Sequence, residues 1–324
     1  MRIVFALGGN ALLRRGEALT AANQARNIRI AAEALAPICI AGHEVVITHG
    51  NGPQVGLLAL QAAATPDTPY PLDVLDAESA GMIGYLIEQQ LMNVLPGGTL
   101  IAALLTQVRV DRHDPAFRKP TKPIGAVYAE SEARAVAAER GWRVAADGKG
   151  WRRVVASPAP LEILEARVIA LLVAQKVIVI CTGGGGIPVV ELEDGSFTGI
   201  EAVIDKDSAS ALLARQLGAD WLVMLTDVDA LYLGWGTDMA RPLRHATPGE
   251  LASVKFANGS MGPKVRAACD FVNETGKHAG IGTLKDANAI LEGTAGTVIS
   301  INPETQGGQA LRQARMPPRH NSQR

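Results

Sequence analysis

Three lysines occupy positions at which a protein could stabilise negative charge on a phosphoryl group. Lys206 lies between Asp205 and Asp207, Lys264 follows a Gly-Pro pair, and Lys122 lies within a Pro-Thr-Lys-Pro run. Phosphoryl transfer needs little covalent help from a protein, but it needs positive charge and amide donors around the moving group. A carboxylate beside Lys206 could orient two lysines, although an Asp-Lys-Asp run by itself is also typical of a solvated surface loop.

Three glycine clusters follow runs of apolar residues and could supply the amide donors. They are Gly8-Gly9, Gly50-Asn51-Gly52 and the run Gly183 to Gly186. The apolar runs are typical of buried strands, and glycine lets the main chain approach a ligand closely. Parallel strands end at a common edge, where anions meet exposed amides and helix N-termini. We therefore expect the three turns to converge at the carboxyl edge of a parallel sheet.

Strands and helices alternate along most of the chain, which favours an α/β fold with a mainly parallel sheet. The low aromatic content, 4%, indicates a core of Ala, Val, Ile and Leu. Strands are predicted at 3–7, 44–48, 100–110, 177–180, 221–225, 280–282 and 297–300. Helices are predicted at 21–36, 54–64, 73–95, 161–175, 208–217 and 264–274.

The segment 111–158 interrupts this alternation. It is rich in Lys and Arg, and it contains a predicted helix over 129–140 and a hairpin around Asp147-Gly148-Lys149-Gly150. We interpret it as an inserted lid subdomain, with a solvated surface excursion as the alternative. The residues from 303 to 324 are polar and are predicted to form a disordered tail.

Composition argues against several classes of partner and compartment. The formal net charge is −1, so no global field attracts nucleic acid or a membrane surface. No apolar stretch reaches the roughly 20 residues that a membrane span needs, and the N-terminus shows no signal region. The three widely spaced cysteines do not form a disulfide framework, which favours a reducing cytosol. We expect a cytoplasmic protein.

Other catalytic patterns are missing from the sequence. There is no Walker-type phosphate loop, no dinucleotide-binding Gly-x-Gly-x-x-Gly after a strand, and no Gly-x-Ser-x-Gly elbow. The six histidines lack metal-ligand spacing. His49 could touch a ligand or simply bond to the main chain. Asp227 and Asp229, after the strand at 221–225, could line a nucleotide pocket or hold a turn.

Several motifs together resemble those of the carbamate kinases, a branch of the amino-acid kinase superfamily. The resemblance runs from Met1 to about Ile301, and its specificity comes from the joint occurrence of the motifs in this order. They are residues 6–12 (ALGGNAL), 48–56 (THGNGPQVG), 120–125 (PTKPIG), 183–189 (GGGGIPV), 204–207 (IDKD), 225–229 (LTDVD) and 259–265 (GSMGPKV).

The resemblance implies a three-layer α/β/α sandwich, a homodimer and the reaction ATP + carbamate ⇌ ADP + carbamoyl phosphate with Mg²⁺, run toward ATP in catabolism. Lys206 and Lys264 would neutralise the transferred phosphoryl group, Asp207 would organise these lysines, and Lys122 would reach in from the lid. The metal would be held mainly by phosphates, without a dedicated protein site. Neither nucleic acid nor a membrane is expected as a partner.

The resemblance also divides the chain into two lobes. Residues 1–204, including the lid, would bind carbamate or carbamoyl phosphate, and residues 205–302 would bind the nucleotide. The first lobe would hold substrate and phosphoryl oxygens with Gly8, Gly9, Asn10, Gly50, Asn51 and Gly52. The second would hold the nucleotide with Thr226, Asp227, Val228, Met261 and Gly262.

One feature favours the carbamate kinase branch within the superfamily, and another departs from its pattern. Other amino-acid kinases resemble one another in a lysine two residues before the first Gly-Gly, where this chain has Ala6, so Lys206 and Lys122 would replace that charge. Residues 230–236 depart from the Asn-containing loop that is more common in the family. Two other functions remain open: transfer to another small carboxylate, phosphonate or phosphate monoester, and ligand binding without catalysis.

Overall fold

The computed structural model describes residues 1–302 with the exception of 15, 63–69, 149 and 257–260. The tail predicted from residue 303 and the tip of the predicted hairpin at Lys149 lie outside the described residues, as do Gly259 and Ser260 of the last motif.

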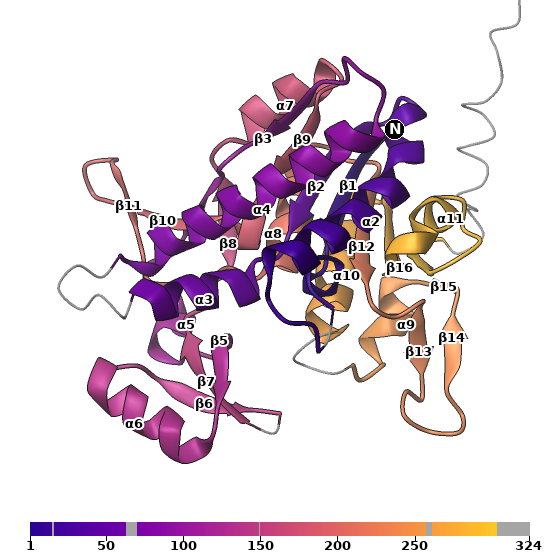
Figure 1. Ribbon diagram of the computed structural model, residues 1–324. Coiled ribbons are helices and arrows are strands. Elements are labelled where there is room, and N and C mark those ends of the chain that lie inside the picture. Colours follow the sequence, from indigo (N-terminus) through magenta and orange to yellow (C-terminus); the bar gives the residue numbers. More distant parts are fainter. Residues whose placement is uncertain (15, 63–69, 149, 257–260, 303–324) are drawn as a thin grey trace, which may run out of the picture.

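An eight-stranded sheet forms the centre of the molecule, in the order β15-β17-β16-β12-β1-β2-β9-β3 (Figure 1). Within the described part of the chain, its neighbouring strands are parallel except β16 and β17. The predicted mainly parallel sheet is therefore confirmed. The strands are β1 (Arg2–Leu7), β2 (Glu44–His49), β3 (Ile101–Ala103), β9 (Ile178–Cys181), β12 (Trp221–Thr226), β15 (His245–Ala246), β16 (His278–Thr283) and β17 (Thr297–Ile299).

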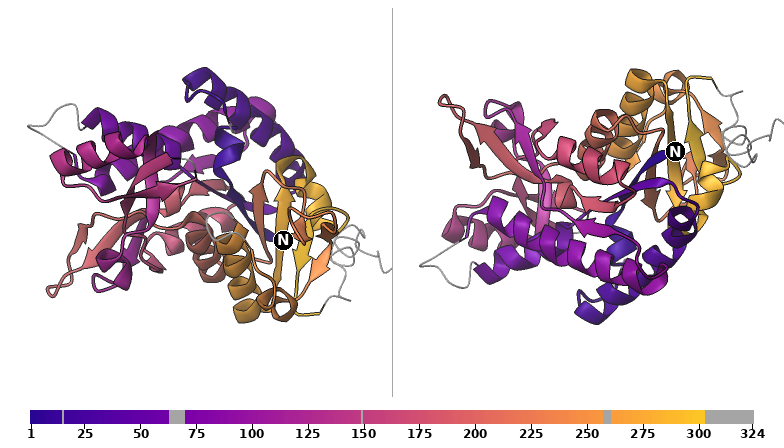
Figure 2. Two further views of the ribbon diagram at one scale, coloured as in Figure 1. Left: turned by 90° about the horizontal axis from the view of Figure 1, so that it is seen from below. Right: turned by 90° about the horizontal axis from the view of Figure 1, so that it is seen from above.

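Helices cover both faces of this sheet, as the two views in Figure 2 show. One face packs against α2 (Ala21–Ile40), α4 (Leu72–Val94) and α11 (Ala287–Leu291). The other packs against α7 (Ala166–Ala174), α8 (Lys206–Gln216) and α10 (Met261–Thr275). Each face of the sheet forms a hydrophobic core with its helices. Strand β1 contributes to both cores, because alternate side chains point to opposite faces: Phe5 lies in the core with α2 and Val4 in the core with α8. The three-layer sandwich is confirmed.

Shorter elements surround the edge of the sheet where the glycine turns lie. They are α1 (Gly9–Leu12), α3 (Gly52–Ala62), the 3₁₀ helices η1 (Gly183–Gly185) and η2 (Leu284–Asp286), and α9 (Pro248–Ala252). Strands β13 (Leu231–Leu233) and β14 (Arg241–Leu243) pair as an antiparallel ribbon, so the atypical segment 230–236 contains the first strand of this ribbon and the residues just after it.

A second, four-stranded sheet corrects two sequence predictions. Its order is β11 (Phe197–Gly199), β10 (Ile187–Glu191), β4 (Gln107–Val110) and β8 (Pro160–Ile163). The strand predicted over 100–110 is two strands, β3 and β4, in different sheets. The helix predicted over 161–175 begins only at Ala166, because residues 160–163 pair with β4. Pairing between residues distant in sequence overrides the local pattern in both segments.

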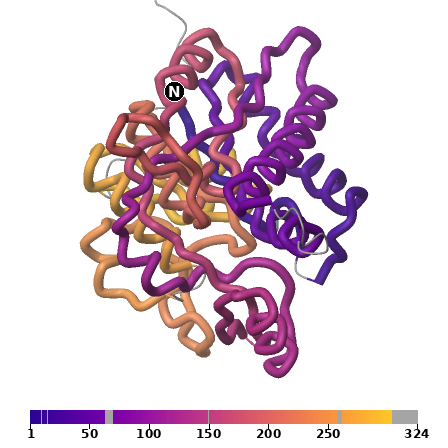
Figure 3. The backbone as a smooth tube through the Cα atoms, turned by 90° about the vertical axis from the view of Figure 1, so that its left-hand side faces the viewer, coloured from indigo at the N-terminus to yellow at the C-terminus, as the bar shows by residue number. Residues whose placement is uncertain are grey.

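The segment between β4 and β8 folds as a small unit that projects from the body (Figures 1 and 3). It contains α5 (Pro115–Arg118), β5 (Lys122–Tyr128), α6 (Glu130–Arg140), β6 (Val144–Asp147) and β7 (Gly150–Val155), with the sheet order β5-β7-β6. The guanidinium of Arg153 lies 4.5 Å from the ring centre of Trp142. Gly56 of α3 packs directly on Gly125 of β5, where a β-carbon on Gly56 would overlap the opposing main chain.

Candidate active site

The three glycine turns lie together at one edge of the central sheet. They follow β1, β2 and β9, which are neighbours in the sheet, and β12 ends beside the first of them. The Gly8 amide donates to the Leu225 carbonyl oxygen at 2.9 Å, and the Gly50 amide donates to the Leu7 carbonyl oxygen at 3.3 Å. A β-carbon at Gly50 would lie 3.8 Å from the Gly9 nitrogen, so the first two turns touch.

Lys206 brings helix α8 to these turns. It is the first residue of the helix, and the carboxylate of Asp205 caps the helix by accepting hydrogen bonds from the amides of Asp207 and Ser208. The Lys206 ammonium donates to the carbonyl oxygen of Leu7 at 3.2 Å, immediately before the first glycine turn. Its charge therefore adds to the positive end of the helix dipole at this edge.

Asp207 joins the two lysines that the sequence selected. Its Oδ1 lies 2.9 Å from Lys206 Nζ, and its Oδ2 accepts a hydrogen bond from Lys264 Nζ at 2.8 Å. The three side chains are 6%, 11% and 14% exposed for Asp207, Lys206 and Lys264. We call these residues the cationic cluster: one carboxylate and two ammonium groups leave one unbalanced positive charge in a nearly dry site.

Burial and ion pairing act against each other in the cationic cluster. Burial by itself would raise the pKa of Asp207, but Lys206 and Lys264 outweigh it and hold that pKa well below its usual range. Burial lowers the pKa of Lys206, and the pairing with Asp207 opposes this effect. Asp207 is therefore ionised throughout the neutral range and holds both ammonium groups in place.

Lys122 lies at the start of β5 and contacts a different carboxylate. Its Nζ donates to Asp205 Oδ2 at 2.8 Å, and both side chains are partly exposed. Burial by itself would raise the pKa of Asp205, and Lys122 more than compensates, so that pKa is lowered. The projecting unit thus reaches the N-terminus of α8, the helix that carries Lys206 and Asp207.

A cavity of about 620 Å³ opens beside the cationic cluster and the first glycine turn. Its walls come from the end of β12, from the β13 segment with Tyr232 and Trp235, and from the start of α10. Of the predicted nucleotide residues, Thr226, Asp227, Val228 and Met261 line this cavity, together with Gly8, Gly9 and Lys264. Asp229 instead accepts a hydrogen bond from the Tyr232 hydroxyl at 2.9 Å and so holds the adjoining turn.

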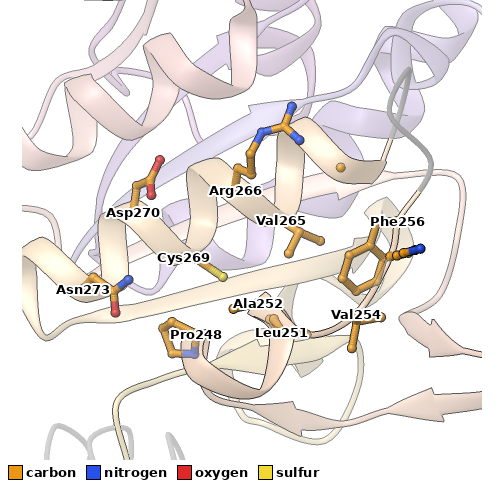
Figure 4. A pocket seen from close by; sticks show the side chains of 12 residues that line it. Pro248, Leu251, Ala252, Val254, Phe256, Val265, Arg266, Cys269, Asp270 and Asn273 are labelled. Atoms are coloured by element: carbon orange, nitrogen blue, oxygen red, sulfur yellow. The ribbon is translucent and has the colours of Figure 1, made fainter.

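Gly262, the remaining predicted nucleotide residue, lines a neighbouring cavity of about 510 Å³ between α9 and α10. Figure 4 shows this cavity with Cys269 and Val265 on one wall and Leu251 on the other. Burial, with a smaller effect of Asp270, raises the pKa of the Cys269 thiol to about 11, so this thiol is not a nucleophile at neutral pH. None of the residues of the cationic cluster lines this cavity.

The turn of residues 50–52, which we call the Asn51 turn, is fixed from behind by residues that sequence reasoning missed. The Asn51 side chain is buried and donates to Asp76 and Ser79 of α4. Asp76 and Ser79 are three residues apart on a helix, and this spacing does not indicate contact with a turn 25 residues before Asp76. His49, left open by the sequence, ends β2 in a buried position, where burial lowers its pKa to about 4 and keeps the imidazole neutral.

The predicted site residues thus divide into two groups. Lys206, Lys264, Asp207, Gly8, Gly9 and Gly50 lie around one site, with Lys122 at its border. The Asn51 side chain points into the protein instead of toward this site, which leaves main-chain amides as the groups that residues 50–52 can offer. Asn10 belongs to α1, and its side chain lies outside the described residues.

The carboxylates near this site are not arranged as a metal-binding group. Among the described residues, no three His, Cys, Asp or Glu side chains lie close enough together to hold a metal ion. Asp207 and Asp205 are paired with lysines, and Asp227 borders the cavity. In the described part of the chain, none of the helices has the length and apolar character to span a membrane.

Comparisons with known proteins match almost the whole chain. The amino acid kinase family model matches residues 1–282. A carbamate kinase of Haemophilus influenzae is 54% identical over 305 residues, which make up 94% of this chain and 98% of that protein. The carbamate kinase from Giardia lamblia bound to AMP-PNP has a TM-score of 0.85 at 43% identity, over 92% of this chain and 98% of that one. Its complex with citric acid has a TM-score of 0.86 over the same shares.

Proposed function

This chain belongs to the amino acid kinase family and, within it, to the carbamate kinases, and we propose that its cationic cluster carries phosphoryl transfer between ATP and carbamate. The observation that carries the proposal is the position of Asp207, which holds two ammonium groups beside the first glycine turn and the 620 Å³ cavity. The positive charge that a phosphoryl group in transfer requires is therefore already in place.

In the direction of phosphorylation, a carbamate oxygen attacks the γ-phosphorus of ATP. The new bond joins that oxygen to phosphorus, and the bond to the β,γ-bridging oxygen breaks, which gives carbamoyl phosphate and ADP. Carbamate is already an anion, so no residue has to remove a proton from it. This fits a site whose nearest imidazole, His49, is buried and neutral. Catalysis is then a matter of positioning and charge.

Each part of the site has a proposed role in that step. Lys206 and Lys264 neutralise the equatorial oxygens of the phosphoryl group, and Asp207 prevents the two ammonium groups from moving apart. The main-chain amides of the turns at Gly8-Gly9 and Gly50 to Gly52 hold carbamate and phosphoryl oxygens. Lys122, which pairs with Asp205 in this structure, reaches in from the lid toward the carbamoyl phosphate side.

The nucleotide occupies the 620 Å³ cavity in this proposal. Thr226, Asp227 and Val228 at the end of β12 form one wall, and Met261 begins the helix that brings Lys264 to the phosphates. Tyr232 and Trp235, whose ring centres lie 5.2 Å apart, offer an aromatic surface to the base. Mg²⁺ would accompany the nucleotide, held mainly by phosphate oxygens, and would offset the negative charge of the phosphates.

The unit at 111–158 acts as a lid in this proposal, with residues 1–204 on the carbamate side and 205–302 on the nucleotide side. The Lys122–Asp205 ion pair and the Gly56–Gly125 contact join this unit to the body. If the lid closes on substrate, hydrogen exchange in 111–158 slows when carbamoyl phosphate or ADP binds. Unchanged exchange would make this unit an ordinary surface insertion.

We further propose that the protein is a cytoplasmic homodimer that makes ATP from carbamoyl phosphate in catabolism. Support for the dimer comes from α4, the β3 edge strand and the residues around it, which expose Met82, Tyr85, Met92, Leu100 and Leu105. The cysteines Cys39, Cys181 and Cys269 are free, as expected in a reducing compartment. Sedimentation of the purified protein at micromolar concentration tests the dimer.

A coupled assay tests the proposed reaction. Folded protein is supplied with ADP and carbamoyl phosphate, with and without Mg²⁺, and ATP is measured. We expect ATP formation that depends on Mg²⁺. Absence of ATP from well-folded protein counts against carbamate as the acceptor, and phosphorylation of another small carboxylate, phosphonate or phosphate monoester would replace it. Nucleotide binding without turnover of any acceptor would indicate a binding protein.

A further inference from the structure

The Asn51 turn is attached to helix α4 through a single buried carboxamide. Both hydrogens of the Asn51 side-chain nitrogen are used: one is donated to Asp76 Oδ1 and the other to Ser79 Oγ at 2.8 Å. The Ser79 hydroxyl in turn donates to the main-chain oxygen of Asp76 at 2.9 Å. Asp76 and Ser79 are 0% exposed and Asn51 is 2% exposed, so water does not compete for these bonds.

The third glycine cluster provides the space for this carboxamide. A β-carbon at Gly184 would lie 2.6 Å from both Cγ and Oδ1 of Asn51, and one at Gly183 would lie 2.6 Å from the His49 ring. Gly184 also has a φ of +71°, a conformation that other residues adopt only with strain. The cluster at 183–186 therefore supports the Asn51 turn from behind, a function that its position after a strand did not reveal.

The main chain of Asn51 meanwhile begins helix α3. Its carbonyl oxygen accepts hydrogen bonds from the amides of Gln54 and Val55, both at 2.9 Å. The side chain and the main chain of one residue thus join α4 to α3 across the turn. Because both its side chain and its carbonyl oxygen are held, the peptide units on either side of Asn51, which carry the amides of residues 51 and 52, are fixed relative to the two helices.

We propose that Asp76 is a positioning residue for phosphoryl transfer, which holds the amides of the Asn51 turn in their anion-binding orientation through the Asn51 carboxamide. The proposal rests on the proposed function, because it assigns to the Asn51 turn the binding of carbamate or phosphoryl oxygens. Asp76 itself touches no substrate. Its effect on the reaction passes through Asn51, with Ser79 as the second acceptor.

The surroundings of Asp76 favour its neutral form. Its Oδ2 is buried with no hydrogen-bond partner among the described residues. Burial raises the pKa of Asp76 to about 7; the bond from Asn51 lowers it, and Asp73 one turn earlier raises it further. A neutral carboxyl still accepts from Asn51, whereas an ionised one would bury a negative charge without a cation beside it.

The elements packed against α4 bring no compensating cation to Asp76 in the described residues. Helix α3, strand β3 and η1 contain no titratable side chain, and the buried His49 of β2 is neutral. The other charged side chains on packed elements have partners of their own: Glu191 of β10 lies 4.0 Å from Arg109, Arg26 of α2 pairs with Glu17, and Arg29 pairs with Glu33. Glu201, which accepts from the first amide of α4, pairs with Arg153. Cys181 of β9 is buried, which raises its pKa to about 12.

The test compares Asp76→Ala with Asp73→Asn, which removes a neighbouring carboxylate without touching Asn51. We expect Asp76→Ala to raise the KM for carbamoyl phosphate about tenfold or more and to leave the KM for ADP within about twofold, because a buried donor loses its acceptor on the carbamate side. Asp73→Asn should change neither. Equal changes in both KM values, or a folded Asp76→Ala enzyme with the wild-type KM for carbamoyl phosphate, would overturn the proposal.

Two further variants keep the test decisive if Asp76→Ala does not fold. Ser79→Ala removes the second acceptor and should raise the same KM by a smaller factor. The exchange Asn51→Asp with Asp76→Asn rebuilds the bond in the opposite direction and should recover a large part of what Asn51→Asp alone loses. A double variant no better than Asn51→Asp alone would contradict the coupling.

Hydrogen exchange separates this proposal from the proposed function. Residues 50–55 should exchange faster in Asp76→Ala or Ser79→Ala than in Asp73→Asn, whether or not carbamoyl phosphate is the substrate. If the wild-type protein forms no ATP, the carbamate assignment fails, and faster exchange would still support the control of the turn by Asp76. Unchanged exchange at 50–55 would refute that control even in an active enzyme.

Discussion

The cationic cluster and the Asn51 turn approach the same strand, β1, from different sides, and the protein holds them by different forces. Lys206, Asp207 and Lys264 are held by ion pairs of 2.9 and 2.8 Å. The Asn51 turn is held by a carboxamide bonded to a carboxyl and a hydroxyl of α4, and among the described residues no cation lies beside that carboxyl. One half of the site, the charged half, is fixed by ion pairs, and the other, the neutral half, is fixed by hydrogen bonds of an uncharged carboxamide in a dry pocket.

This difference follows from what each half does in the proposed reaction. The phosphoryl group needs fixed positive charge, and two ammonium groups can be kept close together only by a carboxylate between them. The amide donors of the Asn51 turn need orientation alone, and a negative charge behind them would weaken their attraction for an anion. Burial raises the pKa of Asp76 to about 7, so this carboxyl provides the orientation with less of that charge than an ordinary carboxylate. Substitutions in the charged half should therefore affect mainly kcat, and substitutions in the neutral half mainly the KM for carbamoyl phosphate.

The largest effect is expected from breaking the charged half at Lys264. We predict that Lys264→Ala lowers kcat about 10²–10³-fold, the usual cost of removing one transition-state charge. The fold should persist, because Asp207 keeps its pairing with Lys206. ATP formation from ADP and carbamoyl phosphate measures the rate, and circular dichroism checks the fold.

A matched control for this variant is Lys277→Ala. Lys277 forms a half-exposed ion pair with Asp220, 3.1 Å apart, away from the glycine turns. It should keep wild-type turnover, because exposed pairs contribute little. A Lys264→Ala enzyme that turns over as fast as the Lys277→Ala control would remove Lys264 from the mechanism.

The two halves also differ in how far the sequence reveals them. Lys206 and Asp207 are adjacent, Lys264 lies in the first turn of a helix beside Gly262, and the family resemblance assigned the three to one site. The convergence of the turns after β1, β2 and β9 at one edge of the sheet was expected from apolar runs that end in glycine, whereas the order of these strands came from the structure. Asp76, by contrast, is one carboxylate among several on a long helix, and its importance arises only when α4 packs against the Asn51 turn. Burial and long-range packing are properties of the fold that no local pattern encodes.

A smaller effect is expected from crowding the neutral half at Gly184. Gly184→Ala places a β-carbon against the Asn51 side chain and should cost about 1–3 kcal/mol of overpacking. This comes in addition to the strain of a positive φ, about 1–2 kcal/mol. The KM for carbamoyl phosphate should rise with little change in the KM for ADP, because the Asn51 turn and not the cationic cluster is displaced.

Gly195→Ala is the control that isolates the contact with Asn51. Gly195 has a φ of +81°, but a β-carbon there meets nothing within 4 Å. Backbone strain therefore destabilises both variants, and overpacking destabilises only Gly184→Ala. Urea unfolding gives the two free energies. Equal losses in the two variants would show that the carboxamide moves aside freely, which contradicts a tightly held Asn51 turn.

The finest comparison uses pH, because the carboxyls of the two halves titrate in different ranges. The lowered pKa of Asp207 stabilises the folded state above the unfolded value of about 3.9, and this contribution is lost as the pH falls through the lower folded pKa. The raised pKa of Asp76 has the opposite effect on the pH dependence of stability. Its folded pKa, about 7, lies above the unfolded value, so stability falls as the pH rises from about 4 to about 7 and is constant above.

The difference between wild type and Asp76→Asn isolates this effect, because every other titrating group is common to both proteins. We expect the difference in free energy of unfolding to change with a slope of up to about 1.4 kcal/mol per pH unit between pH 4.5 and 6.5 and to level off near pH 7, with the variant gaining relative to wild type. Urea unfolding at closely spaced pH values measures it. A difference that does not vary with pH would mean that Asp76 is ionised in the folded protein. In that case, both halves of the site would depend on buried charge.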